Sequence, residues 1–217
     1  MMKRKVFLVD DHPLVREWLG TLIDRQPDLA VCGEADGAPE ARQKIEAMEP
    51  DVAVVDITLE KGSGLELIKD LKLIRPGMPV IVLSMHDESL YAERAMRAGA
   101  KGYVVKKETT RKILLAIRDV LEGKVYLSGR AAGGLVEKIL DGKTSDASPV
   151  DRLSDRELEV FRMIGQGMKT REIAESLHLS MKTVQVYCAR IKEKLNLADA
   201  TQLIREAMRW HESAAQG

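Results

Sequence analysis

The residues best suited to chemistry in this sequence are carboxylates that follow short apolar runs. Asp10 and Asp11 end a run that begins at Val6, and Asp56 ends a run that begins at Val52. Adjacent carboxylates repel, and each is costly to bury unless a positive charge is shared between them. Oxygen ligands of this kind suit Mg²⁺, which binds few protein groups and completes its shell with water and phosphate oxygens. The pattern therefore predicts a magnesium site.

A carboxylate beside such an ion can also act as a nucleophile. Asp56 could attack a phosphoryl group and form an acyl phosphate. Ser84 closes a fourth apolar run and Lys106 follows a fifth. The hydroxyl can hydrogen-bond a phosphoryl oxygen, and the ammonium can neutralise added charge. For any single residue a helix N-cap is the commoner explanation, but the combination favours a phosphate site.

These side chains need a fold that brings the ends of the runs together. Five β-rich apolar runs alternate with segments of helical periodicity, which predicts an α/β domain with a doubly wound parallel sheet covered on both faces. We expect the strand order 2-1-3-4-5, which places the first and third strands side by side. The predicted strands are 6–10, 30–35, 52–57, 80–84 and 102–105, with helices centred on 14–23, 40–48, 65–73, 91–98 and 113–121.

Length and composition predict a soluble protein of two domains. The chain has 217 residues, of which 45% are hydrophobic and 31% charged. We find no run near the ~20 apolar residues of a membrane span, and the first apolar run is too short for a signal peptide. A cytoplasmic location without a membrane partner is therefore expected. Cys32 and Cys188 fall in different domains, so we expect two small buried side chains, without a disulfide or metal site.

Four segments resemble the receiver domain of two-component response regulators. They are DDHPLVR at 10–16, VVDITLEKGSGLEL at 54–67, VLSMHD at 82–87 and GAKGYVVKKE at 99–108. The resemblance implies that Asp56 accepts phosphate from a sensor histidine kinase. It also implies that Asp11 and Asp56 bind Mg²⁺ directly. Asp10 would act through water, and the carbonyl of Thr58 would be a further ligand.

The same resemblance implies a switch made of Ser84 and Tyr103. In this family the hydroxyl moves toward the phosphoryl group and the aromatic ring follows it inward. The added charge thereby shifts the equilibrium between two packing arrangements of the domain. Without the resemblance, Tyr103 would be an ordinary half-buried strand residue. Glu60 departs from the family, because many members carry proline there. With Gly62 and Gly64 nearby, we expect a looser loop.

A linker separates this domain from a second one. Apolar residues at 135, 136, 139 and 140 could form one or two helical turns, and the following stretch, 141–151, is rich in Gly, Ser, Asp and Pro. That composition is typical of a flexible linker. We expect a receiver domain over 1–123, a linker with a possible short helix over 124–150, and a DNA-binding domain over 151–217.

The second domain carries helix signals at close spacing. Ser154 and Glu157 predict a capping box at the start of one helix, which should end near residue 166. Thr170 and Ser180 are expected to cap two further helices, the second running from 181 to 195. Two helices joined by so short a turn predict a helix-turn-helix.

A helical wheel of residues 181–195 separates a core face from a polar face. The core stripe consists of Val184, Cys188, Ile191 and Leu195. If the helix enters a major groove, the side chains expected to meet base edges are Lys182, Gln185, Val186, Ala189 and Glu193, flanked by Arg190. Those better placed for phosphates are Thr183, Tyr187, Arg190, Lys192 and Lys194. The segment holds four basic residues against one acidic, although the whole chain has 34 of each. A solvated surface explains such a face equally well.

Residues 153–197 resemble the four-helix DNA-binding domain of the NarL/LuxR group. Fused to a receiver, this domain implies a transcription regulator that binds double-stranded promoter DNA as a homodimer once phosphorylated. Gln185, Tyr187 and Ala189 differ from residues that the family often carries, so base preference does not follow. The last helix, expected over about 200–210, resembles the one through which such domains pair. Its apolar residues, shared between packing and a dimer contact, are Leu203, Ile204, Ala207 and Trp210.

Two alternatives compete with this interpretation. A haloacid-dehalogenase-like phosphatase also uses a strand-end aspartate with Mg²⁺, but it needs a general acid two residues on, where this chain has Thr58. A receiver whose second domain acts only through protein contacts would bind no DNA. The residues favour a regulator over an enzyme.

Overall fold

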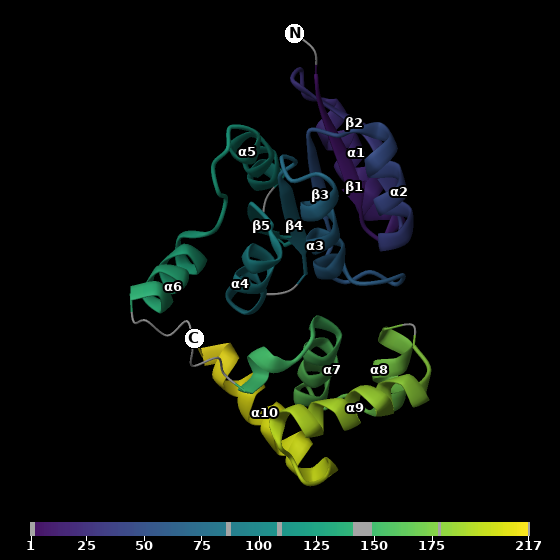
Figure 1. Cartoon of the computed structure of the whole chain (residues 1–217), viewed down its shortest axis with the longest axis vertical. Helices are drawn as coiled ribbons and strands as arrows, with labels where there is room; N and C mark the ends of the chain where they lie inside the picture. The colour runs from purple at the N-terminus through teal and green to yellow at the C-terminus, as the bar shows by residue number, and fades with distance from the viewer. Residues whose placement is uncertain (1–2, 86–87, 108–109, 141–148, 178, 217) are drawn as a thin grey trace. The chain divides into compact units, whose positions relative to one another are not determined.

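The computed structural model describes residues 3–85, 88–107, 110–140, 149–177 and 179–216. They divide into two compact units, Met1–Glu137 and Lys138–Gly217. The first unit contains a sheet with helices, and the second is helical (Figure 1). None of the helices in these ranges combines the length and the apolarity that crossing a membrane requires.

A five-stranded parallel sheet organises the first unit, in the predicted order β2-β1-β3-β4-β5. Its strands are β1 (Arg4–Val9), β2 (Leu29–Ala35), β3 (Val52–Val55), β4 (Val80–Ser84) and β5 (Gly102–Val105). Both β3 and β4 are buried along their whole length, which is why their sequences are apolar throughout. β1 and β3 end slightly earlier than predicted, so Asp10 and Asp56 lie just beyond the strands.

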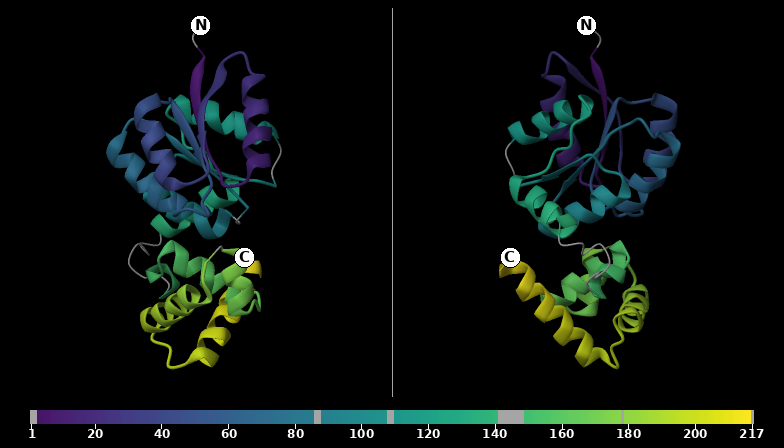
Figure 2. Two further views of the ribbon diagram at one scale, coloured as in Figure 1. Left: turned by 90° about the vertical axis from the view of Figure 1, so that its right-hand side faces the viewer. Right: turned by 60° about the vertical axis from the view of Figure 1, so that its left-hand side comes forward.

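Five helices cover the sheet: α1 (Pro13–Asp24), α2 (Ala38–Met48), α3 (Gly64–Ile74), α4 (Glu88–Ala98) and α5 (Thr110–Leu121). Buried side chains of α1 and α5 join one core cluster with β1, β3 and β4. Helices α2, α3 and α4 contact one another in order along the sheet (Figure 2). This arrangement brings the carboxyl ends of all five strands to the same edge, where ligands bind in such folds.

After α5 the chain first extends the sheet and then forms a helix. Tyr126 makes a parallel bridge to Gly102, and its side chain packs against the core cluster. Helix α6 (Gly129–Leu140) follows, so the helix predicted in the linker is present and exceeds two turns. The predicted linker residues 141–148 lie outside the described residues. The short 3₁₀ helix η1 (Pro149–Arg152) comes after them.

Four further helices build the second unit: α7 (Asp155–Gly165), α8 (Thr170–Ser176), α9 (Met181–Leu195) and α10 (Ala200–Gln216). The predicted capping box is confirmed at α7, because Ser154 Oγ accepts from Glu157 N at 3.4 Å and Glu157 Oε2 accepts from Ser154 N at 2.7 Å. Ser180 caps α9 as predicted, accepting from Thr183 N at 3.0 Å. These local polar signals therefore define two helix starts correctly.

Two predicted helix boundaries are wrong, the start of α8 and the end of α10. Lys169, not Thr170, is the N-cap of α8, since Thr170 is already helical and Glu172 accepts the Lys169 amide at 2.7 Å. Helix α10 runs to Gln216 instead of about 210. The apolar pattern stops at Trp210, but residues 211–216 include no glycine or proline that would end the helix there.

The core stripe predicted for α9 faces the other helices. Val184 and Ile191 are fully buried, whereas Cys188 and Leu195 are half-buried. Cys32, in strand β2 at the sheet edge, is also half-buried. Both thiols are free, as expected, but the prediction that both cysteines are buried is wrong, because each lies at the rim of its unit's core.

The last helix packs mainly against α7. Leu203 and Ala207 are buried, and the ring of Trp210 lies 5.7 Å from that of Phe161, measured between centroids. Ile204 is 49% exposed. Of the four apolar residues expected to serve packing and a dimer contact, three therefore pack inside the domain and Ile204 faces solvent.

Candidate functional site

Backbone pairing positions two carboxylates at the edge of the sheet. Asp10 directly follows β1 and its amide donates to Ala35 O at 3.2 Å, while Asp56 follows β3 and its amide donates to Val9 O at 2.8 Å. Because β1 and β3 are neighbours, the two side chains emerge at the same place. Both residues are nearly buried, at 5% and 3% exposure.

Lys106 reaches the same point from the end of β5. Its amide donates to Ser84 O at 2.7 Å, which holds the backbone of β5 beside β4. Its Nζ lies 2.6 Å from Asp10 Oδ2 and 2.6 Å from Asp56 Oδ2. The Lys106 side chain is only 8% exposed. One buried ammonium is therefore shared by two buried carboxylates.

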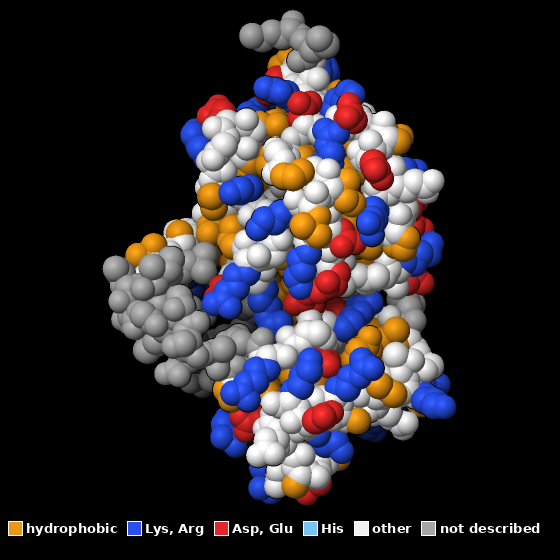
Figure 3. All heavy atoms as spheres, in the orientation of Figure 1, with side chains coloured by type: hydrophobic (Ala, Val, Ile, Leu, Met, Phe, Trp, Pro, Cys, Tyr) orange, Lys and Arg blue, Asp and Glu red, His pale blue; other side chains and the backbone are white. Residues whose placement is uncertain are grey.

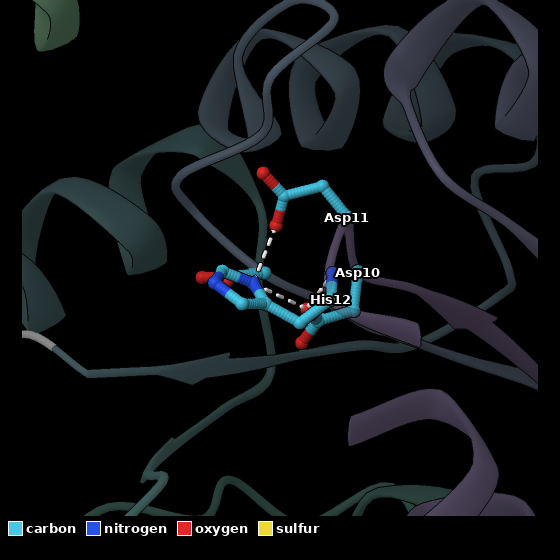
Figure 4. Close-up of side chains that lie close together, drawn as sticks. Asp10, Asp11 and His12 are labelled. Atoms are coloured by element: carbon cyan, nitrogen blue, oxygen red, sulfur yellow. Dashed lines mark hydrogen bonds and ion pairs between the residues drawn. The ribbon is translucent and has the colours of Figure 1, made fainter. Parts of the chain in front are cut away.

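Asp11 and His12 complete the cluster (Figure 4). Asp11 Oδ2 accepts the Glu60 amide at 3.0 Å, and its Oδ1 lies 2.7 Å from His12 Nδ1. The same imidazole nitrogen is 3.2 Å from Asp10 Oδ1. Ligand atoms of Asp10, Asp11, His12 and Asp56 all lie within 4.8 Å of one another. His12 was not among the predicted site residues, although its place next to the aspartate pair was a signal.

The charges of the cluster are unbalanced. Burial raises the pKa of Asp56 to about 6, Lys106 opposes this rise and Asp10 adds to it. Burial alone would lower the pKa of Lys106, but the Asp56 and Asp10 carboxylates raise it, so the amine stays charged. Three carboxylates thus face one ammonium. A small hard cation would remove the excess negative charge.

The donor set fits Mg²⁺. The carboxylates of Asp10, Asp11 and Asp56 provide oxygen ligands within reach of a single ion, an arrangement typical of magnesium sites. Asp11 Oδ1 is buried and accepts no well-formed hydrogen bond from the residues that the structure describes. It therefore has a lone pair for a ligand. Thr58 donates its amide to Asp56 Oδ1 at 3.2 Å, and the role of its carbonyl stays a prediction.

Hydrogen bonds connect the loop that follows Asp56 to its surroundings, and the looser loop expected at Glu60 stays a prediction. The Glu60 amide is bound by Asp11, and the Gly64 amide donates to Ile57 O at 2.9 Å. A Cβ at Gly64 would overlap the carbonyl oxygen of Asp56. Glycine therefore allows α3 to begin directly against the acidic residue.

Ser84 and Tyr103 lie together behind the cluster. Ser84 is completely buried, Tyr103 is 1% exposed, and their side chains are hydrogen-bonded to each other. Burial raises the pKa of Tyr103, so its phenol keeps its proton. The role of the pair as a switch stays a prediction.

Most of the predicted DNA-facing side chains lie on the exposed face of α9. The exposed ones are Lys182, Gln185, Val186, Ala189, Arg190, Glu193 and Lys194, and the half-buried ones are Thr183, Tyr187 and Lys192. Figure 3 shows Lys and Arg side chains over the face of the second unit on which α9 lies. Lys194 differs from the others, because its Nζ lies 2.6 Å from Oε2 of the buried Glu157. An ion pair inside the domain therefore competes with a phosphate contact.

Two protein families match the chain. The response regulator receiver domain matches residues 6–118, and the luxR family of bacterial regulatory proteins matches residues 151–207. DevR/DosR of Mycobacterium tuberculosis, described as a DNA-binding transcriptional activator, is 37% identical over 198 residues, which are 91% of each chain.

Solved structures agree with both matches. A LuxR-family two-component response regulator from Aurantimonas sp. SI85-9A1 is 34% identical, with a TM-score of 0.59 over 64% of this chain and 99% of that one. The response regulator ChrA, of a heme-sensing two-component system, is 30% identical, with a TM-score of 0.52 over 98% of this chain and 99% of that one. The likeness thus extends over both units.

Proposed function

Because this chain belongs to the NarL/FixJ family of two-component response regulators, we propose that phosphorylation of Asp56 switches it between two states of DNA binding. It is a DNA-binding transcription regulator and not an enzyme. The phosphatase alternative also fails on chemistry, since Thr58 stands where a general acid is needed. The alternative of a second domain that binds no DNA conflicts with the luxR-family match.

The observation that carries the proposal is the ammonium shared by Asp56 and Asp10. Lys106 lies 2.6 Å from an oxygen of each carboxylate, in a site where water is largely excluded. Electrostatic interactions are stronger in such surroundings than in water. A phosphoryl group added to Asp56 would therefore find its countercharge already in place.

The proposed reaction transfers a phosphoryl group from a phosphohistidine of a sensor kinase. An oxygen of Asp56 attacks phosphorus and forms a P–O bond, while the P–N bond breaks and its electron pair returns to the imidazole. Lys106 stabilises the charge that collects on the phosphoryl oxygens, and Ser84 donates a hydrogen bond to one of them.

Mg²⁺ is the proposed cofactor. Asp11 and Asp56 would hold the ion directly, with Asp10 acting through water and Thr58 through its carbonyl. When bound, the ion would supply positive charge to the oxygens of the transferring group. Asp11 Oδ1 supports this assignment, because it is buried and accepts no well-formed hydrogen bond from the described residues, although His12 Nδ1 lies 2.7 Å away.

The DNA contacts are proposed for α9. Lys182, Gln185, Val186, Ala189 and Arg190 are exposed on one helix and would face the bases of a major groove. The residues proposed for phosphate contacts are Thr183, Tyr187, Arg190 and Lys194. Pairing of two chains would let each occupy a half-site, and the second contact would gain from its high effective concentration. Ile204 is exposed and available for this homodimer.

The remaining partners follow from the family. A receiver domain implies a kinase, and we propose a sensor histidine kinase as the donor. We further propose that the protein works in the cytoplasm, where promoter DNA and the kinase domain are both accessible.

The test is phosphorylation by acetyl phosphate in the presence of Mg²⁺. Asp56→Asn should reduce labelling at least 100-fold, because the amide lacks the nucleophilic oxygen. The control is Asp51→Asn, which changes an aspartate at the opposite end of the same strand, where it accepts from Lys5 N at 2.7 Å. Labelling should persist in the control. Equal labelling of Asp56→Asn and wild type would show that the acceptor is another residue.

A further inference from the structure

Helix α6 is attached to the receiver through its first turn. Ser128 caps the helix, because its Oγ accepts the Ala131 amide at 3.2 Å and its carbonyl accepts the Ala132 amide at 2.9 Å. The Ser128 amide itself donates to Oε1 of Glu88 at 2.8 Å. Glu88 is the first residue of α4 and is 9% exposed. The start of α6 is therefore held by a nearly buried carboxylate of another helix.

A second attachment lies two residues earlier, at Tyr126. The Tyr126 carbonyl accepts the Tyr103 amide at 2.9 Å, and the Tyr126 amide donates to Lys101 O at 2.9 Å. The chain thus pairs with the free edge of β5, at the residue whose side chain contacts Ser84. This pairing uses backbone atoms only, so a change in side-chain hydrogen bonding leaves it intact.

Both attachments lead back to the switch pair. Ser84 precedes Glu88 by four residues, so the hydroxyl that would bind a phosphoryl oxygen and the carboxylate that holds α6 are close in the chain. Tyr103 is hydrogen-bonded to Ser84 through its side chain and to Tyr126 through its backbone. The first turn of α6 is therefore connected to each member of the pair.

Building on the function proposed above, we propose that Glu88 is a positioning residue that couples phosphorylation of Asp56 to the linker helix. In the unphosphorylated protein, Glu88 holds the first turn of α6 against α4. When Ser84 turns to the phosphoryl group, it draws the start of α4 with it and Glu88 releases the Ser128 amide. Tyr126 stays paired with β5 and acts as the pivot for α6.

The geometry suits a two-state contact. A carboxylate bound to an amide at a helix N-terminus is a charge-assisted bond in a favourable dipole field. At 2.8 Å it lies in the middle of the hydrogen-bond range, so a displacement of about 1 Å breaks it. A buried carboxylate without its donor is costly, so the held state is favoured until phosphorylation compensates for the loss of the contact. Packed contacts of this kind change between discrete arrangements.

Amide hydrogen exchange of the wild-type protein tests the release directly. Beryllofluoride with Mg²⁺ serves as the phosphoryl analogue. Its addition should raise exchange at Ser128, Ala131 and Ala132 at least fivefold, while Tyr126 and Tyr103 stay protected as internal references. Unchanged protection at Ser128 would overturn the proposal. Equal loss at Tyr126 would also overturn it, since the whole segment would then detach without a pivot.

A variant tests the same coupling through the affinity for the phosphoryl analogue. Linkage is reciprocal: if phosphorylation weakens the contact to α6, that contact must weaken binding of the analogue by the same factor. If holding α6 opposes the phosphorylated packing, removing the hold must favour that packing. Glu88→Ala should bind beryllofluoride about fivefold more tightly than wild type, a coupling at the low end of the usual range. The matched control is Glu93→Ala, which removes a carboxylate of the same helix that pairs with Arg97. It should leave the affinity within twofold of wild type.

The outcomes separate this inference from the proposed function. If wild type binds beryllofluoride and Asp56→Asn does not, the acceptor assignment stands whatever Glu88→Ala does. An unchanged affinity in Glu88→Ala would then refute the coupling alone. Equal binding by wild type and Asp56→Asn would instead refute the acceptor. Glu88→Gln retains an oxygen acceptor and should fall between wild type and Glu88→Ala, whereas general loosening of α4 would make both variants alike.

Discussion

The two units each bury a carboxylate 2.6 Å from a lysine amine, yet the two pKa values shift in opposite directions. Burial raises the pKa of Asp56 to about 6, and Lys106 only partly opposes it. Burial also acts to raise the pKa of Glu157, but Lys194 and the Ser154 amide outweigh it, so the net shift is downward.

The difference lies in the other neighbours of each carboxylate. Asp56 faces Asp10, a like charge that shares its ammonium. Glu157 instead accepts a backbone amide at the start of a helix, where the dipole favours negative charge. The receiver thus holds a reactive acid in a costly charged state, while the DNA-binding unit uses its buried acid for structure. In the second unit, the charges proposed for function lie exposed on α9.

The largest effect should come from those exposed charges. Lys182→Ala combined with Arg190→Ala should weaken DNA binding about 100-fold at low salt and make the slope of log K against log salt shallower by about one, because only Arg190 of the two is also assigned to a phosphate. The control is Arg42→Ala with Lys44→Ala, an equal loss of charge on α2 of the receiver. Titration of labelled duplex at several salt concentrations measures both. An unchanged slope would show that these α9 residues do not contact DNA. The contrast between a buried reactive acid in the receiver and exposed functional charges on α9 would then be wrong.

Removal of the structural acid should have the next largest effect. Glu157→Gln should lower the free energy of unfolding of the second unit by about 2 kcal/mol, because it weakens a helix cap and leaves Lys194 without its charge partner. Since the folded pKa is lowered, this stabilisation is present at neutral pH and is lost as pH falls through the folded value. Amide exchange of α7 and α9 across pH measures it. If Glu157→Gln lowered the free energy of unfolding equally at acidic pH, the effect would come from packing and not from charge.

The smallest effect should have the opposite sign. Without divalent ions at pH 8, Asp56→Asn should raise the stability of the receiver by about 1 kcal/mol, since it removes a charge held against Asp10 but also one partner of Lys106. Because the folded pKa is raised to about 6, the difference appears as pH rises through that value and vanishes in acid. Amide exchange of β3 and β4 measures it.

Magnesium provides the control for that experiment. Mg²⁺ should stabilise wild type through linkage and affect Asp56→Asn much less, since the variant lacks a ligand. If Asp56→Asn destabilised the ion-free receiver at pH 8, the carboxylate would be structural, and the two units would no longer differ.

Much of the fold could be predicted because its signals are local. Buried parallel strands are apolar throughout, so the runs ending at Asp10 and Asp56 marked β1 and β3 within two residues. The capping box of Ser154 and Glu157 needs only neighbouring residues, and it was confirmed. The errors fell where the signal was weak. Thr170 is a common capping type but lies one residue inside α8, and the residues just after Trp210, where α10 was expected to end, carry no glycine or proline.

The sequence by itself determined the kind of chemistry and where in the chain it resides: acids after two strands, a lysine after a third, and a polar face on one helix. Tertiary structure alone decided the pairings, namely that one ammonium serves two carboxylates, that His12 borders them, that Lys194 binds Glu157, and that Glu88 holds Ser128. The reason is physical. Strand and helix signals act between near neighbours in the chain, whereas an ion pair across the fold depends on burial and on distances that only packing sets.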